Sequence, residues 1–158
     1  MKTVLFRSLL TLIIFSCMDS PDQKYSPIVS LQIHDLIKDS LLNIRALEIE
    51  DNRIRAVSAI GDSYSVDLRT NKVYVNRVNV DTINFRASAI VNNNYFTLSI
   101  GNPAYLFRDT ELVYKETHPN IFYDEIHFWN SMEGDAIGET VDGSMSILIT
   151  RNRGKSWN

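Results

Sequence analysis

The chain has 158 residues, of which 44% are hydrophobic and 22% are charged, as expected for one ordinary globular domain. It carries 16 basic and 19 acidic residues, and this net charge of −3 argues against nucleic acid as a partner, because binding to phosphates requires basic patches. Its single cysteine, Cys17, excludes an intrachain disulfide and a thiol pair that could hold a metal.

Residues 1–16 have the pattern of a bacterial lipoprotein signal peptide. Lys2 and Arg7 supply the basic start, and the apolar run over residues 9–15 is too short to span a bilayer. Cys17 then follows a small residue, as in a lipobox, so we expect cleavage before Cys17 and attachment of a lipid to it. The alternatives are an uncleaved anchor or ordinary cleavage nearby. Cleavage would remove two of the 16 basic residues, and the remaining 14 against 19 acidic residues give a net charge of −5.

Two short segments separate this signal from the repeats. Residues 17–27 contain two prolines and no hydrophobic periodicity, so we expect a flexible tether. In residues 28–43, Val29, Leu31 and Ile33 alternate as in a strand, although other apolar residues of this segment also fit one face of a helix. We favour a lead-in strand. The protein is then expected at the bacterial cell envelope, held to the outer membrane or the cell surface by its lipid.

Three repeats of about 40 residues make up the rest of the chain. Arg45 lies in an Ile-Arg-Ala triplet, Arg86 follows 41 residues later in a Phe-Arg-Ala triplet, and Tyr123 lies 37 residues beyond in a Phe-Tyr-Asp triplet. Each triplet starts a first strand, and a second strand ends near a glycine. Third strands are expected at residues 63–68, 104–108 and 146–150, and fourth strands at residues 73–78 and 111–116.

Four short strands per repeat are typical of a propeller blade. We therefore predict an all-β, partial β-propeller of about three four-stranded antiparallel blades over residues 44–158. The last strand of the third blade would begin at Trp157.

The end of the chain predicts a strand, a tight turn and an aromatic residue that covers the turn. Asn152 can close an Asx-turn, and Gly154 can adopt the positive φ that follows. This turn resembles the Asp-box of sialidase-like propellers, Ser/Thr-x-Asp-x-Gly-x-Thr-Trp. Thr150, Gly154, Ser156 and Trp157 match it, and Asn152 replaces the aspartate. In that family the box is a structural turn and not a catalytic site.

Residues 44–158 as a whole resemble the sialidase-like, Asp-box (BNR) repeat propellers of Bacteroidetes. That group is related to photosystem II assembly-factor propellers and often carries the label oxidoreductase. The matching stretches include residues 98–104, 112–116 and 136–150, while Glu139-Thr140 stands where Asp-Pro is usual. The resemblance implies a lipid-anchored, extracytoplasmic module for ligand binding or assembly. The oxidoreductase label has no support in the sequence, which lacks a Gly-x-Gly-x-x-Gly motif and a haem-attachment motif, so no cofactor is expected.

Arg45, Arg86 and Tyr123 are the candidate ligand-binding residues. First strands of blades line the channel of a propeller, and these three residues occupy equivalent triplet positions. Two guanidinium groups beside an aromatic ring suit a carboxylate or an anionic sugar, so the ligand would be a glycan or a protein. The alternative is that both arginines bind adjacent blades and hold the repeats together.

Other functions remain as alternatives. Sialidases draw an arginine triad, a Tyr/Glu nucleophile pair and an acid from several blades, and no motif places such a set here, so a sialidase-like glycoside hydrolase is the second hypothesis. A truncated, non-functional propeller is the third. Glu125 and His127 share a strand face but suit a solvated pair, and the nearby acidic residues lack the spacing of a calcium loop, so no metal is expected. Self-association through the two uncovered outer blade faces is also expected.

Overall fold

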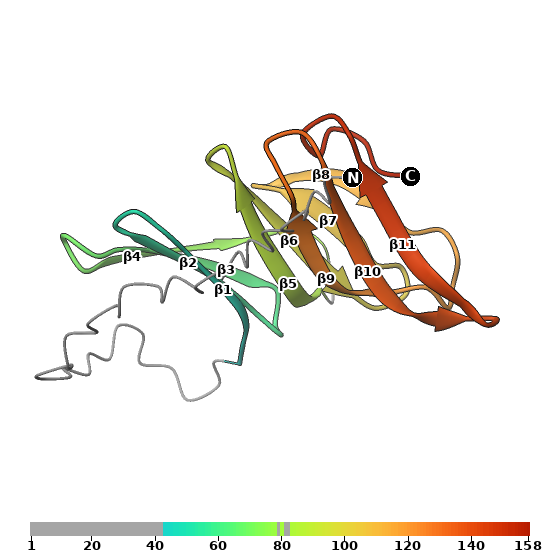
Figure 1. Cartoon of the computed structure of the whole chain (residues 1–158). Coiled ribbons are helices and arrows are strands. Elements are labelled where there is room, and N and C mark those ends of the chain that lie inside the picture. Colours follow the sequence, from blue (N-terminus) through green and yellow to red (C-terminus); the bar gives the residue numbers. More distant parts are fainter. Residues whose placement is uncertain (1–42, 79, 81–82) are drawn as a thin grey trace, which may run out of the picture. The chain divides into compact units, whose positions relative to one another are not determined.

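The structure is a computed structural model that describes residues 43–78, 80 and 83–158, all within one compact unit, Asp35–Asn158. The signal peptide, the tether, the lead-in strand and Cys17 lie outside the described residues. Every element in the described part of the chain is a β-strand (Figure 1). Across those residues, no helix is long and apolar enough to cross a membrane.

Eleven strands form three antiparallel sheets in the described chain. The first sheet contains β1 (Ile44–Glu50), β2 (Arg53–Ser58), β3 (Asp62–Asp67) and β4 (Lys72–Arg77), in that order. The second sheet contains β5 (Asn84–Val91), β6 (Asn94–Ile100), β7 (Tyr105–Arg108) and β8 (Glu111–Lys115). The third sheet contains β9 (Tyr123–Phe128), β10 (Gly134–Val141) and β11 (Ser144–Thr150). In each sheet consecutive strands pair, so the predicted all-β series of antiparallel sheets is confirmed.

The third sheet has three strands instead of four in the described chain, but a fourth begins to form. The N–H of Ile149 donates to the carbonyl of Asn158 at 2.8 Å, and the N–H of Asn158 donates back at 3.1 Å. This reciprocal pair is the unit of an antiparallel ladder. The chain therefore returns along β11 after Trp157, where the fourth strand was expected.

Two-residue turns with positive φ connect several strand pairs. Asn92 and Asn93, with φ of 50° and 62°, join β5 to β6, and Asp142 and Gly143, with φ of 52° and 81°, join β10 to β11. Positive φ at both central residues is the type I′ geometry that suits the twist of a hairpin. Asparagine, aspartate and glycine tolerate this backbone better than other residues do.

Each innermost strand carries a β-bulge within two residues of its start on the ladder. Ile44 pairs with Ser58 while Ala46 pairs with Val57, so Arg45 is the extra residue in β1. By the same register, Arg86 is the extra residue in β5 and Asp124 the extra residue in β9. The bulge therefore places Asp124, and not Tyr123, at the position that Arg45 and Arg86 occupy.

Two hydrophobic clusters join the sheets. Strands β1 and β2 contact β5, and this junction packs Val57 against Phe85, Tyr95 and Phe107. Arg55 also crosses it, 5.3 Å from the centre of the Tyr95 ring. The junction is therefore partly polar.

The junction between the second and third sheets is aromatic. Strands β5 and β6 contact β9 there. The Phe96 ring lies 4.8 Å from Phe128 and 6.3 Å from Trp157, measured between ring centroids. Burial of one such side chain contributes about 1.5–3 kcal/mol, so these rings help to hold the two sheets together.

The turn after β11 is held by a network of side-chain hydrogen bonds. The Thr150 hydroxyl accepts from the N–H of Gly154 at 3.0 Å and donates to Asn152 Oδ1 at 3.1 Å. Asn152 Oδ1 also accepts from the N–H of Ser156 at 3.0 Å, and its Nδ2 donates to the Ser156 hydroxyl at 2.7 Å. Trp157 Nε1 donates to the carbonyl of Gly154 at 3.2 Å. All five predicted turn residues thus take part in one structural network.

Candidate functional site

The innermost strands β1, β5 and β9 border a hollow with a volume of about 500 Å³. Its polar lining residues are Arg45, Glu48, Arg86, Ser88, Glu125 and His127. These six side chains come from all three sheets, because β5 lies beside both β1 and β9. The hollow is therefore built by the arrangement of the repeats and not by any one of them.

Arg86 and Asp124 form an ion pair between the second and third sheets. Arg86 Nε donates to Asp124 Oδ1 at 2.8 Å, and the two side chains are 43% and 32% exposed. A pair this exposed contributes less than about 1 kcal/mol to stability. The two terminal amino groups of Arg86 make no hydrogen bond with any other described residue, so they remain able to donate to a ligand.

Arg45 lies on the same hollow and is exposed. It makes no hydrogen bond or ion pair with any other residue that the structure describes. The structure thus brings the two predicted arginines to one hollow, with donor groups available on both.

Tyr123 lies elsewhere, in a buried network at the start of the third sheet. Its hydroxyl donates to Glu116 Oε2 at 2.7 Å, and the Tyr114 hydroxyl donates to the same oxygen at 3.0 Å. The backbone N–H groups of Thr117 and His118 donate to Glu116 Oε1 at 2.8 Å each. The carboxylate of Glu116 therefore ties the end of the second sheet to the first strand of the third.

The surroundings of this network set the protonation of its members. Burial is the main cause that raises the pKa of Tyr123 far above its usual range, and the hydrogen bond to Glu116 raises it further. Burial acts to raise the pKa of Glu116 as well, but the four hydrogen bonds together outweigh it, so this pKa lies below its ordinary value. Tyr123 is buried and its hydroxyl is bound to Glu116, so this Tyr/Glu pair links the second and third sheets.

Glu48 and Ser88 are functional candidates that sequence reasoning missed. The Ser88 hydroxyl donates to Glu48 Oε1 at 3.3 Å, across the junction of the first and second sheets. Burial raises the pKa of Glu48, and the hydrogen bond from Ser88 partly offsets this. Both residues lie two or three positions after a bulge arginine, and that spacing is the signal that could have identified them.

The charge of the hollow is mixed. Arg45 and Arg86 supply two cations, Glu48 and Glu125 two acidic groups, and His127 an imidazole. Within the described part of the chain, no group of three His, Cys, Asp or Glu residues is arranged to hold a metal ion. The hollow suits a ligand with both donor and acceptor groups better than a simple anion.

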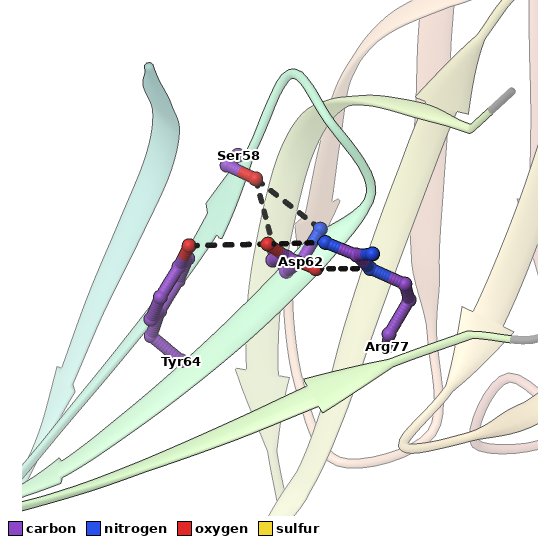
Figure 2. A network of polar contacts seen from close by, with 4 residues as sticks. All are labelled: Ser58, Asp62, Tyr64 and Arg77. Atoms are coloured by element: carbon purple, nitrogen blue, oxygen red, sulfur yellow. Dashed lines mark hydrogen bonds and ion pairs between the residues drawn. The ribbon is translucent and has the colours of Figure 1, made fainter. Parts of the chain in front are cut away.

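A second polar network lies in the first sheet (Figure 2). Arg77 donates to the buried Asp62 carboxylate in a bidentate fashion, with Nε 2.6 Å from Oδ1 and Nη2 2.9 Å from Oδ2. The Ser58 hydroxyl accepts from the Asp62 N–H at 3.2 Å. Hydrogen bonds from Arg77 are the main cause that lowers the pKa of Asp62. This network fastens β4 to the β2–β3 turn, and none of its members lines the hollow.

No family model and no curated protein matches the chain. Its fold is similar to the solved structures of U3-55K and of the RRP9 WD40 repeats, each with a TM-score of 0.59 at 10% identity, over 77% of this chain and 39% of the other. It is likewise similar to YCF48 bound to a D1 peptide, with a TM-score of 0.59 at 10% identity, over 74% of this chain and 40% of the other.

Likeness at this level of identity shows the fold alone. The three sheets are blades of a propeller-type fold, as predicted. The chain spans about two fifths of the length of each of these structures.

Proposed function

We propose that this chain is a ligand-binding or assembly module, and that the hollow between β1, β5 and β9 binds a peptide segment of a partner protein. The observation that carries the proposal is the pair of arginines on this hollow with donor groups that no described residue uses. Arginine binds a carboxylate through two parallel N–H groups, so a carboxylate of the peptide would lie against Arg45 and Arg86. The solved propeller YCF48 holds a bound peptide, which supports a peptide as the ligand class.

The mixed charge of the hollow favours a peptide over a free anion. A free anion would meet Glu48 and Glu125 as well as the arginines, and Asp124 already occupies one donor of Arg86. A peptide has backbone N–H groups that donate to these glutamates while its carboxylate accepts from the arginines. Complementary charges of this kind fix the orientation of a ligand as well as its affinity.

Binding is favoured over glycoside hydrolysis because of the position of Tyr123. A sialidase-like mechanism needs a tyrosine nucleophile exposed to substrate beside a glutamate. Tyr123 does have a glutamate partner, but it is buried and does not line the hollow that holds the two arginines.

Selection from a displayed library of random peptides tests this function. The chain should retain a set of peptides enriched in aspartate and glutamate, and the Arg45→Ala/Arg86→Ala variant should lose them with little change in melting temperature. Arg69→Ala, which removes an exposed arginine in the β3–β4 turn, is the matched control and should bind as the unchanged chain does. Recovery of no peptide, or equal binding by the double variant, would contradict the proposal.

We also propose that a lipid on Cys17 holds the chain at the bacterial cell envelope. The basic start, the short apolar run and the small residue before Cys17 support this. Fractionation of cells that express Cys17→Ser should move the protein from the membrane fraction to the soluble fraction. Unchanged membrane association would rule the attachment out.

A further inference from the structure

We propose that two copies of this chain assemble head to tail, with the third sheet of each copy packed against the first sheet of the other. This would join six blades, a number within the range of about four to eight found in closed propellers. Each copy would use both of its outer sheets once, so the assembly closes. The inference concerns these two surfaces and stands whether or not the hollow binds a peptide.

The outer face of the third sheet repeats a face that is buried in the second sheet. The register places Ile137 of β10 beside Ile147 of β11, at the positions of Leu98 and Leu106 in the second sheet. Leu98 and Leu106 are fully buried in the cluster shared with the third sheet. Ile147 is 50% exposed. The third sheet therefore presents an apolar face of the type that packs on a following blade.

The first sheet presents the complementary side of a junction. Leu47 lies two residues after the bulge in β1, as Ser88 does in β5, and Ser88 contacts the preceding sheet through Glu48. Leu47 and Ile49 therefore point away from the second sheet, and they are 51% and 67% exposed. Placed against the third sheet of another copy, these two side chains would meet Ile137 and Ile147.

The bulge residues make the outer sides of the first and third sheets complementary in charge. At the junction of the second and third sheets, the bulge residues Arg86 and Asp124 form an ion pair. At the junction of the first and second sheets, both bulge residues, Arg45 and Arg86, are cations. In the assembly, Arg45 of one copy would lie against Asp124 and the exposed Glu125 of the other copy. Oδ2 of Asp124 makes no hydrogen bond with any described residue, so it can accept from Arg45. The new junction would thus repeat the Arg86–Asp124 contact with its polarity reversed.

The pairing also completes the hollow. With both copies in place, the bulge residues of six first strands would border one space, and the partner copy would contribute its own Arg45 to it. Arg86 stays 43% exposed while paired with Asp124, so an arginine at this position can hold a carboxylate and still present donors.

Light scattering on the purified chain measures the assembly directly. We expect twice the mass of one copy, where the chain with residues 1–16 still attached has a mass of 18.1 kDa. Ile147→Glu should give the single-chain mass with an intact melting transition, because a charge at the centre of the junction opposes assembly and not the fold of one copy. If the unchanged protein has the mass of a single chain, the proposal is overturned; this would result if another segment of the chain covers these faces. A mass far above that of two chains, which indicates open polymers, would overturn it as well.

Complementary charge reversals test the geometry. Arg45→Asp brings a further carboxylate against Asp124 and Glu125 of the other copy, and Glu125→Arg brings a second guanidinium against Arg45, so each variant alone should be monomeric. When the two variants are mixed, one junction pairs the introduced carboxylate with the introduced guanidinium and the other keeps the natural residues, so a mixed dimer should form. Failure of the mixture to assemble while the unchanged chain is dimeric would overturn this docking, as would single variants that remain dimeric.

Discussion

At the scale of single residues, the bulge decides which side chains share the hollow. The triplets predicted Arg45 and Arg86 at equivalent positions, because both are followed by alanine in matching strands. Tyr123 was aligned with them by its place in the third triplet, yet it corresponds in register to the buried Phe85. The register depends on backbone hydrogen bonds to β10, which the side-chain pattern does not report, so the sequence could not identify Asp124 as the third member.

Replacement of Glu116 should lower the stability of the fold strongly, because its carboxylate accepts four hydrogen bonds. Glu116→Leu would leave the buried Tyr123 hydroxyl and three partly buried donors without an acceptor, and we expect a loss of about 3 kcal/mol in the free energy of unfolding. Glu116→Gln keeps one acceptor for the backbone, and the tyrosine hydroxyls can turn to accept from its amide, so about 1 kcal/mol is expected. Urea denaturation measures both, with Glu139→Leu as an exposed control. Equal stability of all three variants would contradict the structural role of the network.

The same carboxylate makes stability depend on pH. The pKa of Glu116 in the folded chain lies below its ordinary value of 4.5, so its contribution is fully present above that value and is lost as pH falls through the lowered pKa. Asp62, lowered from 3.8 mainly by Arg77, acts in the same direction. Denaturation curves between neutral pH and pH values below 4.5 should show falling stability, with a smaller fall for Glu116→Gln. A variant that loses stability as steeply as the unchanged chain would refute the assignment to Glu116.

At the scale of elements, the strands were predictable because characteristic turn residues mark their ends. The third strands expected at residues 63–68 and 104–108 match β3 and β7 closely, since asparagine, aspartate, glycine and proline mark the turns beside them. Both strands of the β10–β11 pair were expected, but the end of the second strand was placed near Gly138, whereas β10 continues to Val141. Gly138 instead lies inside β10, where an added Cβ would come 1.9 Å from the carbonyl oxygen of Phe122. This glycine serves close packing between strands, and the sequence pattern cannot distinguish that role from a turn.

Alanine substitutions at two glycines with positive φ distinguish the effect of backbone strain on stability from the effect of packing. Gly143 has open space around it, so Gly143→Ala should cost about 1 kcal/mol from its φ of 81° alone. An added Cβ on Gly154 would come 2.4 Å from the Phe96 ring, so Gly154→Ala should cost about 1–3 kcal/mol more through overpacking. Thermal or urea denaturation of the two variants gives the comparison. If both cost the same, the turn after β11 does not depend on contact with Phe96.

At the scale of the whole molecule, repetition explains both the fold and the site. Each sheet is a simple meander that cannot bury its faces alone, and the neighbouring sheets cover each other through the clusters around Phe85 and Phe96. The sequence predicted this series because its period of about 40 residues is visible in the triplets. It could not predict the hollow, because the hollow depends on which residues of β1, β5 and β9 face one another across the junctions.

Hydrogen–deuterium exchange with a selected peptide tests the proposed binding site most directly. The innermost strands are sheet edges and pair on one side only, so their outward amides have no partner strand and should exchange more slowly when a peptide covers them. We predict slower exchange at residues 45–48, 86–90 and 125–128, and loss of this protection in Arg45→Ala/Arg86→Ala. The structure has another hollow, of about 460 Å³, lined by residues 100–102 and 119–122. Protection confined to those two loops, with β1, β5 and β9 unchanged, would contradict the account.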